Sequence, residues 1–250
     1  MENTDPSLVS PPALMHLRTL LQDLRLVSLQ LLPPALREAD PIQDRRAAQL
    51  DRAFFRLLRL ASDLTLVAHF SAPSVLFDTD IVDLAAEICR RAGGLARLSD
   101  LHLRFLCGPE HHLCALDPTA TEALLYHLLS DAMLCSAPGG TITVELRFTC
   151  GTARLSVETA GSHDGRPALP YFESSWRQNL QQRLATSQGG VLISASHHGG
   201  GFRSVLSLPD RQCGNAAAEN TFDLAGGFNP TLIALADALP AEAFLLRSQG

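Results

Sequence analysis

The stretch Asp117–Leu146, DPTATEALLYHLLSDAMLCSAPGGTITVEL, contains the signals that decide the fold. A run of helix-forming residues leads to a Pro-Gly-Gly turn, and apolar and polar residues alternate after it through Thr141–Thr149. This order predicts a helix, a tight turn and a β-strand. His127 and Asp131 are four residues apart, so their side chains lie on one face of the predicted helix.

Two helical patterns come before this stretch. Leucines recur at helical spacing through Ala13–Leu32 between two proline pairs, and residues 47–68 carry apolar residues at alternating steps of three and four. The seam residues are Leu14, Leu17, Leu21, Leu24 and Leu31 in the first segment and Ala47, Leu50, Phe54, Leu57, Ala61, Leu64 and Ala68 in the second. These patterns predict a helical hairpin. Because two helices bury too little surface to be stable alone, we expect a homodimer in which two hairpins form a four-helix bundle.

From Val75 onward, short strand and helix patterns alternate. Strands are predicted at 75–77, 101–107, near Leu113, and at 141–149, 153–159, 191–196 and 202–208, and helices at 81–92, from Pro118, and at 174–187. Turns are expected at Gly108-Pro109, Gly151 and Gly199–Gly201, and the pairs Gly93-Gly94 and Gly189-Gly190 are expected to end helices.

The predicted fold class is therefore α+β, a helical hairpin followed by a two-layer α/β sandwich of mixed sheet and helices. The expected domains are residues 1–71, residues 72–209 and a C-terminal tail at 210–250. Within the tail, the apolar segment 232–246 is expected to form one or two short helices.

Composition restricts the classes of function. A net charge of −6 disfavours nucleic-acid binding, and because all 20 basic residues are arginine, P-loop and Schiff-base chemistry are excluded. No run reaches the roughly 18 apolar residues of a membrane span. The start, MENTDPSLVSPP, lacks a signal-peptide pattern, so we expect a cytoplasmic protein with free, mostly buried thiols. Cys107, His111, His112 and Cys114 lack the paired spacing of a zinc site and are interpreted as part of a turn.

The helix–turn–strand stretch resembles a segment of sensor histidine kinases in which Asn-Leu-Leu-Ser-Asn-Ala precedes a Pro-Gly-Gly turn. Here residues 127–132 read HLLSDA. Residues 189–209, GGVLISASHHGGGFRSVLSLP, resemble the closing hairpin of the same family. With the order of elements over roughly residues 14–208, this resemblance implies a transmitter region, in which a dimerisation and phosphoacceptor hairpin is joined to a catalytic ATPase domain.

The resemblance implies positions that would meet ATP and Mg²⁺. Asp131 replaces the Mg²⁺-binding asparagine and is still a competent oxygen ligand. His127 replaces the other asparagine and cannot offer a donor and an acceptor as an amide does. Thr159 stands where the adenine-binding aspartate would be, two residues before Gly161. For His127 and Asp131, the alternative is a solvated helix face.

The glycine-rich box of the family is absent. Its Gly-Leu-Gly-Leu would fall on residues 175–178, which read SWRQ. Glycines at this position let backbone amides approach phosphates, and the side chains of Trp176 and Arg177 prevent that approach. Arg166 and Arg177 could instead neutralise phosphates through their side chains.

The phosphoacceptor box of the family reads His-Glu-Leu-Arg-Thr-Pro-Leu, and residues 15–21 read MHLRTLL. His16 falls on the polar stripe of the predicted helix, so we expect it to be exposed and to be the candidate phosphoacceptor. The acidic neighbour that would assist the imidazole is missing. The alternative is therefore an ordinary surface histidine.

Two hypotheses follow. In the first, the chain is a dimeric two-component signalling protein with weakened or lost ATP binding and autophosphorylation, and it docks response-regulator receiver domains or acts as a phosphotransferase. In the second, it is an active soluble sensor histidine kinase that phosphorylates His16 with ATP and Mg²⁺ and passes the phosphate to a response regulator. The altered nucleotide positions favour the first, because the loss of several contacts together costs orders of magnitude in affinity.

Overall fold

The structure, a computed structural model, describes residues 11–69, 74–160, 171–196, 201–215, 230–236 and 238–246. Contacts divide the chain into a helical unit, residues 1–71 with 224–250, and a sandwich unit, residues 72–223. The segment predicted as a separate tail is thus shared between both units. Its first part, near Arg211, adds backbone hydrogen bonds to the sandwich, and its last part packs in the helical unit.

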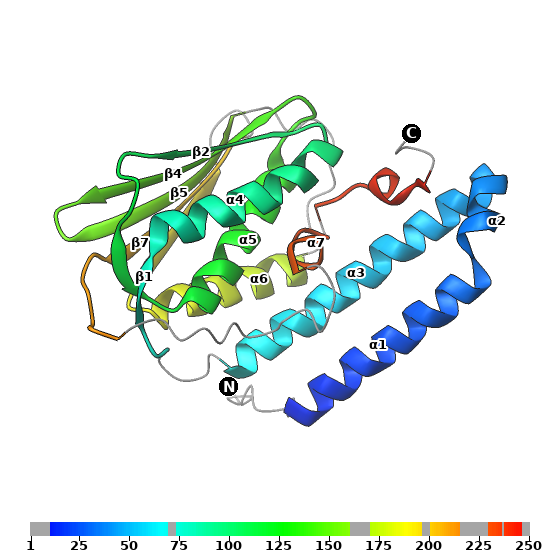
Figure 1. The fold of residues 1–250 in the computed structure, drawn as a ribbon, viewed down its shortest axis with the longest axis horizontal. Helices are drawn as coiled ribbons and strands as arrows, with labels where there is room; N and C mark the ends of the chain where they lie inside the picture. The colour runs from blue at the N-terminus through cyan, green and yellow to red at the C-terminus, as the bar shows by residue number, and fades with distance from the viewer. Residues whose placement is uncertain are drawn as a thin grey trace. The chain divides into compact units, whose positions relative to one another are not determined.

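The helical unit contains α1 (Pro11–Leu31), α2 (Pro34–Ala39), α3 (Pro41–His69), α7 (Pro230–Leu235) and the 3₁₀ helix η2 (Ala241–Phe244). Helices α1 and α3 lie side by side and are joined through α2, as Figure 1 shows. Prolines begin both α2 and α3, where their missing N–H has no helical partner to lose. The predicted hairpin and the short helices within 232–246 are confirmed.

The predicted seam is divided between two faces of each helix. In α1, Leu14 and Leu21 are buried, whereas Leu17 and Leu24 are exposed. In α3, Ala47, Phe54 and Ala61 are buried, whereas Leu50 and Leu57 are exposed. Leu14 and Leu21 in α1 and Ala47, Phe54 and Ala61 in α3 therefore face the core of this chain, whereas Leu31 at the end of α1 is 71% exposed. The core cluster also takes up Ile233 and Ala236 from the α7 region.

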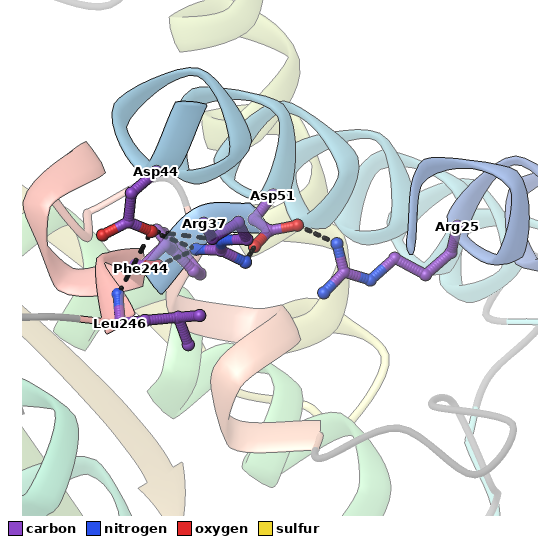
Figure 2. A network of polar contacts seen from close by, with 6 residues as sticks. All are labelled: Arg25, Arg37, Asp44, Asp51, Phe244 and Leu246. Carbon is purple, nitrogen blue, oxygen red and sulfur yellow. Dashed lines mark hydrogen bonds and ion pairs between the residues drawn. The ribbon is translucent and has the colours of Figure 1, made fainter. Parts of the chain in front are cut away.

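A buried ionic network joins α2, α3 and η2. The guanidinium of Arg37 donates from Nε to Asp44 Oδ1 at 3.1 Å, from Nη1 to Asp51 Oδ2 at 3.1 Å and from Nη2 to the Phe244 carbonyl at 2.7 Å. The six residues of this network, shown in Figure 2, are Arg25, Arg37, Asp44, Asp51, Phe244 and Leu246. Two arginines face two aspartates, so the charges balance inside the unit.

The sandwich unit is built from seven strands and three helices in its described part. In chain order they are β1 (Phe77–Asp80), α4 (Ile81–Leu98), β2 (His102–Cys107), β3 (Leu113–Leu116), α5 (Pro118–Cys135), β4 (Thr141–Thr149), β5 (Thr152–Ala160), α6 (Tyr171–Thr186), β6 (Val191–Ser196) and β7 (Phe202–Pro209). Five strands form a sheet in the order β2-β4-β5-β7-β6, with β2 and β4 parallel and the other neighbours antiparallel. Helices α4, α5 and α6 cover one face of this sheet (Figure 1). The predicted two-layer sandwich is confirmed.

Two local strand predictions are wrong. The first strand begins at Phe77, where the pattern at 75–77 ends, because residues 77–80 pair with β3 in a separate two-stranded sheet. The turn at Gly108-Pro109 does not close a hairpin, because β2 pairs with β4 while β3 pairs with β1. The predicted turn at 199–201 lies mostly outside the described residues, although β6 and β7 pair antiparallel as expected.

The two glycine pairs behave differently. Helix α4 continues through Gly93-Gly94 to Leu98, because burial of Ala92 and Ala96 on its inner face offsets the helix cost of about 1 kcal/mol per glycine. Gly189-Gly190, in contrast, ends its helix as predicted. Gly189 has a φ of +74°, and a Cβ on Gly190 would lie 2.7 Å from Leu208 Cδ2, so neither position suits another residue.

Candidate functional site

Helix α5 carries two of the predicted site residues. Its start is fixed by a capping residue and by a residue that follows α6. Asp117 caps the helix by accepting from the Ala120 N–H at 3.1 Å. Gln188, which follows α6, accepts from the Asp117 N–H at 3.0 Å and from the Thr121 hydroxyl at 2.8 Å. The start of α5 is therefore held against the end of α6.

Asp131 faces two donors from α6. Its Oδ1 accepts from Arg177 Nη1 at 2.9 Å, and its Oδ2 accepts from Gln181 Nε2 at 2.5 Å. The Arg177 side chain is only 8% exposed and the Asp131 side chain 18%. Arg177 and Gln181 are four residues apart, which places both on the same helix face. Both carboxylate oxygens are thus bound within the protein.

The other two described positions are buried. His127 is 3% exposed, so the solvated-face interpretation is wrong for it. Thr159 is 2% exposed on β5, and its hydroxyl lies 3.0 Å from the Ser136 hydroxyl, which itself bonds the Ala132 carbonyl at 2.7 Å. The predicted positions Gly161 and Arg166 lie outside the described residues.

These residues do not fit a Mg²⁺–triphosphate group in this arrangement. A metal ion at Asp131 would need oxygens that already accept from α6, and it would meet the positive charge of Arg177. Thr159 is buried, and its hydroxyl contacts the Ser136 hydroxyl. Arg177, which was considered as a side chain that could neutralise phosphates, pairs with Asp131 instead. The contact of Gln181 with Asp131 was not predicted, although its spacing of four residues from Arg177 places both side chains on one helix face.

His16 is exposed on α1, as predicted. Its neighbour Met15 is also exposed, and the Met15 carbonyl accepts from the Thr19 hydroxyl at 3.2 Å. Among the described residues, no carboxylate pairs with His16. Its role as phosphoacceptor stays a prediction.

The residues considered for zinc have separate partners. His111 Nδ1 lies 2.8 Å from Asp80 Oδ2, and this hydrogen bond raises the pKa of the imidazole above its usual value. His112 Nε2 lies 2.7 Å from Asp210 Oδ1. All six cysteines are free, as predicted, but only Cys89 and Cys114 are buried, so the expectation of mostly buried thiols is wrong. Burial raises the pKa of Cys89 to about 12, so its thiol is unreactive.

No helix in the described ranges combines the length and apolar character needed to cross a membrane. No protein-family model matches the chain. The alginate biosynthesis sensor protein KinB of Pseudomonas aeruginosa is 27% identical over 194 residues, which is 71% of this chain. The chain spans about a third of that relative, 31% of its length.

The fold of the chain is also similar to that of solved histidine-kinase structures. Full-length ShkA in complex with AMPPNP matches with a TM-score of 0.54 at 18% identity, over 84% of this chain and 47% of that chain. AdeS of Acinetobacter baumannii matches at 0.50 with 12% identity, over 78% and 95% of the two chains. A histidine kinase of Burkholderia phymatum matches at 0.50 with 16% identity, over 81% and 99%. The chain therefore has the fold of a histidine-kinase transmitter region, a helical hairpin and a sandwich of the histidine-kinase ATPase type.

Proposed function

We propose that this protein is a dimeric two-component signalling protein whose ATPase-type sandwich has lost efficient ATP binding. It acts as a docking scaffold for response-regulator receiver domains or as a phosphotransferase through His16. The observation that carries the proposal is the pairing of both Asp131 oxygens with Arg177 and Gln181. The position that the family likeness assigns to a metal ligand is bound instead by the chain itself.

The free energy of the pairing between Arg177 and Asp131 supports a loss of cation binding at Asp131. To accept a cation, Asp131 would have to leave a guanidinium that is 8% exposed, and an uncompensated charge of this kind costs several kcal/mol when fully buried. Because Asp131 is partly exposed, we take the cost of breaking the pair to be about 1–3 kcal/mol, which weakens the affinity for the cation roughly 5- to 150-fold. The absent glycine box adds to this loss.

The dimer is supported by a stripe of apolar residues on α1. The stripe residues are Leu17, Leu20, Leu24, Val27 and Leu31, all exposed and spaced in alternating steps of three and four. On α3, Leu50 and Leu57 are exposed in the same way, while the alternate seam residues fill the core. A second copy that covers these residues would complete a four-helix bundle. Exposed His16 on α1 would then be accessible to a receiver domain.

Calorimetric titration with ATP in Mg²⁺ tests the loss of nucleotide binding. We expect no binding heat at millimolar nucleotide, and micromolar affinity would instead support an active kinase. Transfer of phosphate from a phosphorylated receiver domain tests the phosphotransferase role. An acid-labile phosphate should form on the wild type and be absent from His16→Ala, whereas equal labelling of both would reject His16.

A further inference from the structure

A surface pocket lies at the edge of the sandwich formed by β2. Its volume is about 410 Å³, and its polar lining comes from Arg97 of α4, His102 and Arg104 of β2 and Thr141 of β4. Strand β2 is at one end of the sheet order and β6, against which α6 packs, is at the other. The pocket is therefore separate from the Asp131–Arg177 pair.

The charge of this pocket is one-sided. Two arginines and a histidine are among its lining residues, and no acidic residue is; Asp100, close by in the sequence, is not part of the lining. Neither Arg97 nor Arg104 forms an ion pair with any residue that the structure describes. Nearby arginines differ, since Arg91 and Arg147 bind glutamates at 2.7 and 2.6 Å. Two arginines without an ion-pair partner in the described part of the chain thus share one hollow, on a chain of net charge −6.

The backbone offers a further donor. The His102 N–H points to β4, where it binds the Gly140 carbonyl at 2.9 Å. Because successive residues of a strand direct their backbone groups to opposite sides, the N–H of Leu103 points to the free edge of β2. Leu103 also lines the pocket. Guanidinium forks together with a backbone N–H are the donor set that binds phosphate oxygens.

We propose that this pocket binds a small anion that carries phosphate groups. Arg97 and Arg104 hold the phosphate oxygens through charge-assisted hydrogen bonds, and His102 and the Leu103 N–H add donors. The volume exceeds that of a single phosphate, so a diphosphate that engages both arginines fits better than inorganic phosphate. This inference is independent of the proposed loss of ATP binding, because it involves no residue of α5 or α6.

The pocket offers a matched pair of blocking variants. Gly93 lines it and Gly94 does not, and a Cβ at either position meets nothing within 4 Å. Gly93→Leu therefore places a side chain in the pocket without removing a charge, while Gly94→Leu makes the same change beside it. Both raise the helix propensity of α4, so both variants should fold. Arg97 and Arg104 are exposed, so Arg97→Gln/Arg104→Gln should also fold.

Backbone-amide NMR titration of the full chain with pyrophosphate at low salt tests the proposal. We expect saturable shifts confined to residues 93–104 and 141, at least about tenfold weaker binding in Arg97→Gln/Arg104→Gln and in Gly93→Leu, and unchanged binding in Gly94→Leu. Inorganic phosphate should bind more weakly than pyrophosphate. The proposal is overturned if the shifts occur elsewhere or do not saturate, if Gly94→Leu weakens binding as much as Gly93→Leu, or if tricarballylate, a carboxylate probe, binds as tightly as pyrophosphate.

Discussion

Two buried arginines, one in each unit, use the same chemistry with different consequences. Arg37 binds two aspartates and a backbone carbonyl, and it joins α2 to a segment more than 200 residues away in the sequence. Arg177 binds one aspartate on the adjacent helix, at a position where the family likeness predicts a ligand site. The first pairing holds a structure together. In the function proposed above, the second also removes a site, because the carboxylate that it neutralises would otherwise be free to bind a cation.

The comparison predicts its largest effect at Arg37. Arg37→Met should destabilise the helical unit by about 3–5 kcal/mol, because it leaves Asp44 and Asp51 buried with too few positive partners. Hydrogen exchange of α3 amides measures this loss. Arg46→Met, the same change at an exposed position of α3, should stay within about 0.5 kcal/mol. Equal effects of the two changes would show that the network contributes nothing specific.

The exposed stripe on the same unit should give the next largest effect. Leu24→Glu should weaken the dimer by about 2–4 kcal/mol, since each copy loses roughly 1–2 kcal/mol of apolar burial. Light scattering at tens of micromolar should then report monomers. Leu26→Glu is the control, because Leu26 is exposed on α1 but lies off the stripe. A wild-type monomer would reject the dimer directly.

Arg177 should matter less for stability than Arg37, because its partner is partly exposed. Arg177→Gln should destabilise the sandwich by about 1–3 kcal/mol, and Arg183→Gln on the same helix by under about 0.5 kcal/mol. The single tryptophan, Trp176, lies beside Arg177 and reports sandwich unfolding by fluorescence. A double-mutant cycle with Asp131→Asn should give a coupling of at least about 0.5 kcal/mol. Additive effects would mean that the two side chains do not interact.

The smallest effect concerns an exposed ionic contact, His111 with Asp80. The hydrogen bond to Asp80, with the nearby charge of Asp83, raises the pKa of His111 above its ordinary 6.5. Its stabilisation is therefore full below pH 6.5 and is lost as the pH rises through the raised value. NMR titration should show a lower His111 pKa in Asp80→Asn, while asparagine still caps α4. An unchanged pKa would exclude the hydrogen bond as its cause.

Local patterns predicted most of the fold. Alternation through 141–159 predicted β4, β5 and the turn between them, because that hairpin depends on neighbouring residues alone. Pairing between distant strands could not be predicted in this way. The residues near Phe77 and Leu113 do not by themselves indicate that β1 pairs with β3. Helix α4 passed through its glycines because burial by the sheet, which local propensity does not include, decided its length.

The resemblance named the residues expected at the site, but their contacts could not be predicted. The sequence indicated that His127, Asp131 and Thr159 had changed, and the structure adds that two of them are buried and the third is paired. That pairing depends on how α5 and α6 face each other, which spacing along one helix does not determine. The network of Arg37 could not be predicted either, since its partners come from two segments, α3 and η2, that are far apart in the sequence.

The central claim, that Arg177 occupies the carboxylate where a metal–nucleotide group would bind, is tested most directly by a crystal structure grown with a non-hydrolysable ATP analogue and Mg²⁺. We expect the contact between Arg177 and Asp131 to persist, with no nucleotide ordered beside Thr159. An ordered nucleotide whose Mg²⁺ is bound by Asp131, with Arg177 turned away, would contradict it.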